Sequence, residues 1–201
     1  LYLFIFLFFS GSFSLSAQEY SAEWGPAYKM PSNSYLHQII MNADGSFLTS
    51  RVKMGGSFSA PKLYLERYSP DLQLQKNVEL KLKTSGKTRT YVDLLKMKGG
   101  HFFLLSSFFN KGHKKNYLFA QTLDPNKLLP NPNLSMIAEI PSYNMYEEGF
   151  FSLHASEDSS RLLINAQIPE KKKDPEAFSF YVYDNQLNLQ WKKIITLPYP
   201  S

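Results

Sequence analysis

Residues 149–197 read GFFSLHASEDSSRLLINAQIPEKKKDPEAFSFYVYDNQLNLQWKKIITL. Four short apolar and aromatic runs are separated here by segments rich in Ser, Asp, Asn and Pro, which is the pattern of strands joined by turns. The runs are GFFSLHA, RLLINAQI, AFSFYVYD and LQWKKIITL. The stretch therefore predicts a complete four-stranded antiparallel sheet.

The same arrangement recurs twice upstream. Residues 34–83 contain the runs YLHQIIM, SFLTSRVK, KLYLERY and LQKNVELKL, and residues 90–140 contain TYVDLLKM, HFFLLSSFF, NYLFAQTL and LSMIAEI. Polar connectors, TSGKTR over 84–89 and PSYNMYEE over 141–148, join the units. The sequence thus predicts three repeats, over 34–83, 90–140 and 149–197.

Two comparisons set the length of the repeat. The octapeptides YSPDLQLQ (68–75) and YDNQLNLQ (183–190) share Tyr, two Leu and the final Gln at a separation of 115 residues, or two repeats. Short turns precede the second strand of each unit, at Asp44-Gly45, Gly99-Gly100 and Ser159-Ser160. Repeats near fifty residues with four strands each are typical of propeller blades. The predicted fold class is all-β, with three consecutive four-stranded antiparallel blades of an incomplete β-propeller.

Two of these turns carry a resemblance to a known family. NADGSFL (42–48) and SEDSSRLLI (156–164) resemble the Ser/Asn-x-Asp-Gly-x-x-Leu turn of the WD40-like repeats in TolB-type β-propellers, and FSFYVYD (178–184) is similar to their third strand. Three departures stand against the likeness: no Trp-Asp dipeptide ends the third strand, the second unit has Lys-Gly-Gly, and Ser follows Asp158. The resemblance implies a fold more than a function, because propellers support many unrelated activities.

Three blades are fewer than the four to eight of closed propellers. An open array would leave an unpaired edge, which natural proteins avoid. We therefore expect an N-terminal part of a larger propeller, with further blades outside these 201 residues. The alternative is a two-sheet β-sandwich, in which strands of different units would pair.

Composition narrows the class of protein. Aromatic residues make up 15% of the chain, which favours strands because aromatics pack well on a half-buried pleated surface. The chain has no cysteine, so disulfides, thiolate metal sites and a Cys nucleophile are excluded. The net charge is +5, but Lys and Arg are spread over all three units, and the densest run, Lys171–Lys173, suits a solvated loop. We expect no nucleic-acid partner.

The first seventeen residues, LYLFIFLFFSGSFSLSA, are uncharged and open with nine bulky apolar residues. They are too short for a membrane span, which needs about twenty apolar residues, and suit a signal peptide. We expect signal peptide 1–17, with cleavage after Ser16 or Ala17, and a lead-in segment 18–33; an uncleaved anchor is the alternative. Because residue 1 is Leu and no basic residue precedes Glu19, the natural sequence is expected to begin upstream. The protein is expected to be bacterial and exported, periplasmic or extracellular, with no lipid anchor and no membrane contact after cleavage.

Candidate functional residues are few. The histidines are His37, His101, His113 and His154. None has the spacing that places two imidazoles on one metal. Since first strands line a propeller's central channel, His37 and His154 are the pair that would converge on a ligand there, with ordinary packing as the alternative.

The carboxylates of the predicted turns are Asp44, Asp71, Asp124, Asp158 and Asp184. Turn-capping explains them without catalysis. One acidic-aromatic cluster would let a sugar or peptide stack, unless it is a solvated connector: Tyr143, Tyr146, Glu147, Glu148 and Phe150. Leu187, Leu189 and Trp191 are expected to pack between blades. No nucleophile elbow or phosphate loop occurs, so no catalytic, cofactor-binding or metal-binding residue is predicted.

Two functions remain open. The first is an exported platform that binds a protein, peptide or glycan through the loops 54–61, 110–115 and 169–176, which join second to third strands and so share one face of the disc. The second is the N-terminal part of a propeller-type hydrolase or lyase whose catalytic residues lie outside this segment.

Overall fold

The computed structural model describes residues 24, 29–55, 61–84, 86–144, 149–169 and 175–200. The predicted signal peptide 1–17 and most of the lead-in 18–33 lie outside these ranges. The described part consists of strands, turns and loops, and none of it forms a helix with the length and apolarity that a membrane crossing requires.

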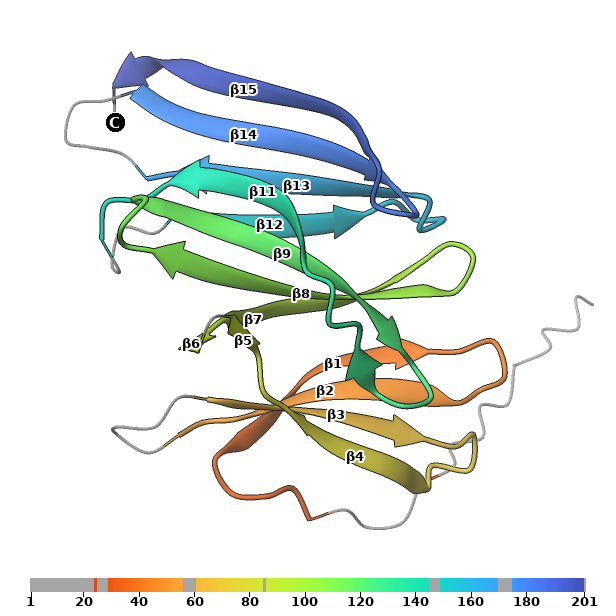
Figure 1. Cartoon of the computed structure of the whole chain (residues 1–201). Helices are drawn as coiled ribbons and strands as arrows, with labels where there is room; N and C mark the ends of the chain where they lie inside the picture. The colour runs from red at the N-terminus through yellow and green to blue at the C-terminus, as the bar shows by residue number, and fades with distance from the viewer. Residues whose placement is uncertain are drawn as a thin grey trace, which may run out of the picture.

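The strands form three antiparallel sheets that follow one another along the chain (Figure 1). The first sheet contains β1 (Ser34–Met41), β2 (Phe47–Lys53), β3 (Lys62–Tyr68) and β4 (Leu74–Leu80). The second contains β7 (Thr90–Met97), β8 (His101–Asn110), β9 (Lys115–Asp124), β10 (Leu129–Pro130) and β11 (Ser135–Pro141). The third contains β12 (Phe150–Ala155), β13 (Arg161–Ile168), β14 (Pro175–Asp184) and β15 (Leu189–Pro200). Each described strand pairs within its own unit, whereas the β-sandwich alternative requires pairing between units.

Two short elements are not predicted by the sequence. The connector after the first sheet contains a small hairpin of β5 (Lys83–Thr84) and β6 (Lys87–Thr88). The long turn of the second unit contains β10, which pairs with the end of β9. This is possible because β9 is ten residues long and β11 covers only its first part, from Lys115 to Ala120.

The first turn of each sheet closes on a residue in the left-handed backbone conformation. Gly45, Gly100 and Ser159 have positive φ angles of 79°, 78° and 54°. Each donates its N–H to the carbonyl three residues earlier, at 3.1, 3.1 and 2.8 Å. The turns lie at equivalent places, as the sequence predicted, but in the third unit the pair that corresponds to Asp44-Gly45 is Asp158-Ser159, one residue before the predicted Ser159-Ser160.

The turn after the third strand repeats as well. Leu72, Leu128 and Leu187 have φ angles of 63°, 57° and 61°. A bulky residue rarely adopts this left-handed conformation. Leu72 and Leu187 occupy the same place in the two matching octapeptides, and each donates its N–H to the carbonyl three residues earlier. In the second unit the turn is one residue longer, because Leu128 donates to the Asp124 carbonyl four residues earlier.

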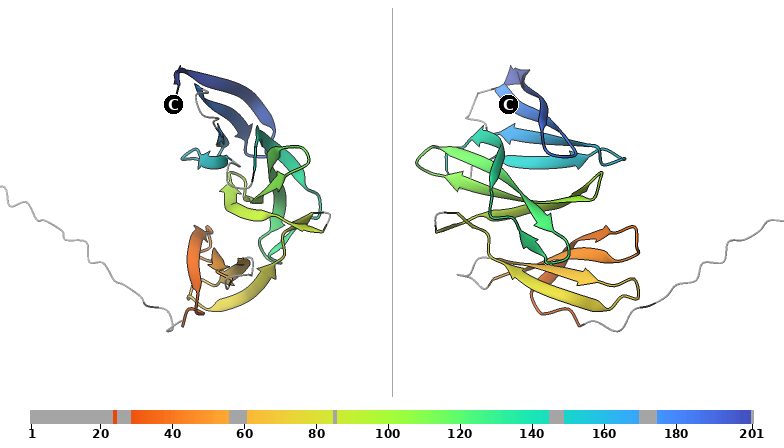
Figure 2. Two further views of the ribbon diagram at one scale, coloured as in Figure 1. Left: turned by 90° about the vertical axis from the view of Figure 1, so that its left-hand side faces the viewer. Right: turned by 45° about the vertical axis from the view of Figure 1, so that its right-hand side comes forward.

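Two hydrophobic cores lie between neighbouring sheets. One joins the first and second sheets around Leu65 and Leu104, and the other joins the second and third around Leu105 and Ile164. Because side chains alternate along a strand, adjacent residues of β8 point into different cores. The sheets therefore stack face to face as successive blades, in an order that Figure 2 shows from two further sides.

The far face of the third sheet is not covered by a described element. Trp191, Ile195 and Phe150 are 48%, 38% and 55% exposed. Of the residues expected to pack between blades, Leu187 packs against the second core, but Trp191 and Leu189 are half exposed. For Trp191 and Leu189, packing between blades stays a prediction, because no described sheet lies beyond the third.

Candidate functional site

A cleft of about 660 Å³ opens between the first and second sheets. Its aromatic wall is formed by Tyr35 and His37 of β1 and Tyr91 of β7, the first strands of their sheets. The other wall is formed by the end of β4 and the following connector, over residues 79–83. The cleft therefore runs between two blades, from the first strands outward.

The aromatic wall is ordered by specific contacts. The rings of His37 and Tyr91 meet edge to face, with centroids 5.3 Å apart. The Tyr91 hydroxyl donates to Ser50 Oγ at 3.1 Å, and burial raises the pKa of Tyr91 well above its ordinary value. Tyr35 remains 47% exposed. The Tyr91 hydroxyl is thus fixed and neutral, and the ring of Tyr35 is open to a ligand.

Asp93 lies two residues beyond Tyr91 on the same first strand. Burial raises the pKa of its carboxyl group, while a hydrogen bond from the Leu94 backbone N–H, at 2.8 Å, and the charge of His37 oppose that rise. Sequence reasoning missed this residue because it considered only the carboxylates in turns and connectors. The available signal was an acidic residue between Val92 and Leu94 in a predicted strand, where burial would raise the pKa of a carboxyl group.

Replacing Asp93 by Asn is expected to stabilise the fold at neutral pH. A carboxyl group whose pKa is raised in the folded protein makes the fold less stable as the pH rises through that pKa. Below its unfolded pKa of 3.8 the group is protonated in both states and costs no stability. The asparagine amide would keep an acceptor for Leu94 N–H without the charge. We expect Asp93→Asn to raise Tm by about 2–4 °C per kcal/mol gained at about pH 7, with the gain vanishing in acid. An equal gain at both pH values would contradict this cause.

The rim of the cleft is polar. Lys62 Nζ and the Tyr64 hydroxyl donate to Glu79 at 3.2 and 3.0 Å. These hydrogen bonds hold the pKa of Glu79 below its ordinary value, and the one from Lys62 has the largest effect. Met54 and Pro61, the two ends of the loop 54–61, also line the cleft.

The second strand of each sheet ends, and the third begins, on the same side of the structure, as the sequence predicted. Strands β2, β8 and β13 all end, and β3, β9 and β14 all begin, at the left-hand side of Figure 1. Residues 56–60 and 170–174 of the loops lie outside the described ranges. A second hollow, of about 480 Å³, contains His113 of the 110–115 loop, whose Nδ1 lies 3.0 Å from the Tyr117 hydroxyl.

The other predicted candidates do not come together. The second sheet separates β1 from β12, so His37 and His154 do not form a pair (Figure 1). His101 opens β8 and its ring lies beside Phe103. Within the described residues, no three side chains among His, Asp and Glu form a group that could hold a metal ion. Tyr146, Glu147 and Glu148 lie outside the described residues, so their cluster has no structural account.

Four of the turn carboxylates cap their turns as predicted. The carboxylates of Asp44, Asp124, Asp158 and Asp184 accept backbone N–H groups two residues ahead at 3.0, 2.8, 3.1 and 2.9 Å. Hydrogen bonding lowers the pKa of all four. They are occupied in local structure, which leaves Glu79, on the rim of the cleft, and Asp93, on β7, as the carboxylates of interest.

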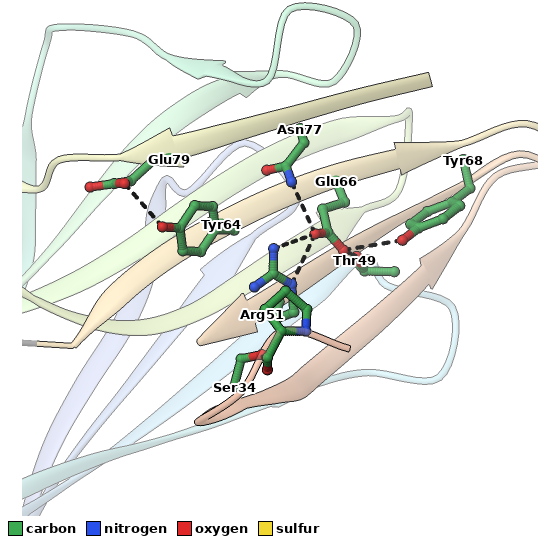
Figure 3. A network of polar contacts seen from close by, with 9 residues as sticks. Ser34, Thr49, Arg51, Tyr64, Glu66, Tyr68, Asn77 and Glu79 are labelled. Atoms are coloured by element: carbon green, nitrogen blue, oxygen red, sulfur yellow. Dashed lines mark hydrogen bonds and ion pairs between the residues drawn. The ribbon is translucent and has the colours of Figure 1, made fainter. Parts of the chain in front are cut away.

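A buried polar network lies on the first sheet (Figure 3). Arg51 donates from Nε and Nη2 to Glu66 Oε1 at 2.9 and 2.6 Å, and both side chains are at most 4% exposed. Asn77, Thr49 and Tyr68 donate to the same carboxylate at 3.2 to 3.3 Å. Because its charge and hydrogen bonds are satisfied within the sheet, we assign this network to stability and not to ligand binding.

Comparison with known proteins bears on the fold. No protein-family model and no curated protein matches the sequence. An α-L-arabinanase from Penicillium chrysogenum, solved with arabinobiose, matches with a TM-score of 0.52 at 12% identity, over 88% of this chain and 53% of that one. The chain is built of β-propeller blades. This likeness shows the fold alone.

Two further structures match with lower TM-scores. The β-propeller domain of the Trilobed protease from Pyrococcus furiosus has a TM-score of 0.46 and 13% identity, over 85% of this chain and 45% of that one. A thermostable family-43 glycoside hydrolase has a TM-score of 0.48 and 13% identity, over 80% and 52%. This propeller chain spans about half the length of each of these three structures.

Proposed function

We propose that this propeller chain binds a peptide or glycan in the cleft between its first two blades. The observation that carries the proposal is the aromatic wall of Tyr35, His37 and Tyr91 on a cleft of about 660 Å³, a volume within the usual range of ligand sites. Exposed aromatic rings beside polar groups are suited to stacking on a sugar or on a peptide side chain. The polar rim around Glu79 supplies donors and acceptors that would fix the orientation of the ligand.

The wider setting of this proposal follows from the sequence. The platform would be exported through the signal peptide 1–17 and would belong to the WD40-like, TolB-type class of blades. Further blades of the same protein would cover the apolar far face of the third sheet. The second sheet packs on the first in this way, and the third sheet packs on the second. The length of the natural reading frame tests this part.

A second candidate, a propeller hydrolase, is favoured by one observation. Asp93 is a carboxyl group with a raised pKa, on a first strand and close enough to His37 for their charges to interact. Catalytic acids are tuned upward by burial in this way. In this reading Asp93 would act as an acid beside the cleft, and partner groups from other blades would complete the site.

Binding to defined probes tests the first proposal. We would titrate the full-length protein with arabinobiose, longer arabino-oligosaccharides and a set of tripeptides by isothermal titration calorimetry. Tyr35→Ala is expected to weaken binding by about 5- to 10-fold, because an aromatic contact contributes about 1 kcal/mol. Met41→Ala is the matched control, since Met41 is an exposed residue at the other end of β1. Equal affinity in Tyr35→Ala and the unchanged protein would reject this site.

A further inference from the structure

Arg89 is a buried arginine between the first and second blades. It lies between β6 and β7 and is only 6% exposed. Its backbone N–H donates to the Leu82 carbonyl at 2.8 Å, which joins the start of the second blade to the end of the first. The guanidinium donates to Ser106 Oγ and, at 2.9 Å, to Gln121 Oε1.

The positive charge of Arg89 is not matched by a carboxylate. Both acceptors are neutral, and no ion pair within the described residues includes Arg89. Nε is buried and has no acceptor among these residues. An arginine stays protonated in proteins, and a buried charge without a counter-charge is costly. Such a cost is offset when an anion supplies the missing charge.

Arg89 lines a cavity of about 440 Å³. The cavity is bounded on one side by the connector 80–84 and on the other by residues of the segment 130–134. Lys81, Lys83 and Arg89 line it, together with the polar side chains of Thr84 and Gln121, and no carboxylate of the described residues lines it. The cavity is therefore positively charged on its walls and large enough for a small ligand.

We propose that this cavity is a binding site for an oxyanion, either free phosphate or the carboxylate of an acidic sugar. The planar guanidinium of Arg89 matches both groups in geometry, and its Nε–H is a donor without an acceptor among the described residues. Lys81 and Lys83, both exposed, add charge that attracts the anion from solvent. Lys81, Lys83 and Arg89 line both this cavity and the cleft of the proposed function. The anion site nevertheless does not require the aromatic wall, because Tyr35, His37 and Tyr91 do not line the cavity.

Calorimetric titration of the full chain with three probes tests the site. The probes are inorganic phosphate, galacturonate and the neutral sugar galactose. We expect one or both anions to bind and galactose not to bind, with binding weaker at high salt. Binding of phosphate alone identifies a phosphate site, and binding of galacturonate alone identifies an acidic-sugar site.

Variants separate a binding role from a structural one. Arg89→Met is expected to abolish anion binding, but Arg89 is buried and this variant is first checked for its thermal unfolding. The double variant Lys81→Met, Lys83→Met changes only exposed side chains and is expected to keep the fold and weaken binding about tenfold. Lys76→Met, at an exposed lysine outside the cavity, is the matched control. Binding weaker than about 10 mM for both anions, or an equal loss in Lys76→Met and the double variant, would overturn the proposal.

Discussion

Replacing Glu66 by Gln is expected to lower the free energy of unfolding by about 3–5 kcal/mol, because it removes one partner of a buried ion pair. Glu66 is 2% exposed and accepts two hydrogen bonds from Arg51. The substitution keeps the size of the side chain and removes the charge that offsets the guanidinium. Urea unfolding measures the effect, as a shift of the midpoint at constant slope.

A matched control for Glu66 lies on the neighbouring strand. Glu79 pairs with Lys62 at 3.2 Å, but both side chains are substantially exposed. Glu79→Gln is therefore expected to cost less than about 1 kcal/mol. Replacing Arg51 and Glu66 together by Met and Leu should recover much of the loss, because a buried pair exchanged for apolar residues is often neutral. A loss under about 1 kcal/mol for Glu66→Gln would show that the network does not stabilise the first sheet.

Gly149→Ala is expected to destabilise the junction between the second and third blades by about 2–5 kcal/mol, the sum of a left-handed backbone cost and an overpacking cost. Gly149 has a φ angle of +65°, and a Cβ atom there would lie 2.4 Å from the Gln167 carbonyl oxygen and 2.6 Å from Ile140 Cδ1. The backbone oxygen belongs to β13 and is held by the sheet. Thermal and urea unfolding of the variant measure the cost.

Gly100→Ala is the control for this prediction. Gly100 has a similar φ angle of +78°, but no described atom lies within 4 Å of the position that a Cβ atom would take. Only the backbone cost of about 1–2 kcal/mol applies there. If both variants lose the same stability, the close approach at Gly149 has no energetic weight.

The strands and turns of this protein can be predicted from sequence because they are local. Alternation of apolar residues locates the strands, and the paired octapeptides place Leu72 and Leu187 at equivalent turns, which their φ angles confirm. The short strands β5 and β10 could not be predicted. Each consists of two residues whose pairing depends on where a neighbouring strand ends, and no local pattern records that.

The candidate sites were much harder to predict, because they form between strands and units that are distant in sequence. Arg51 and Glu66 meet only through the register of β2 and β3. Arg89 was part of a segment that suggested only a polar connector, and its burial depends on how two sheets pack. His37 was singled out for the channel, but its partner is Tyr91 and not His154, since the sequence does not say which strand lies beside β1. Asp93 could have been found from the sequence, because it stands between the apolar residues Val92 and Leu94.

Mapping the ligand on the full-length protein by two-dimensional NMR tests the central claim most directly, namely that the cleft between the first two blades is the binding site. With the tightest oligosaccharide or peptide of the probe set, we predict that the largest chemical-shift changes fall on Tyr35, His37 and Tyr91. Changes concentrated instead around His113, or on the far face of the third sheet near Trp191, would contradict the claim and move the site elsewhere on the propeller.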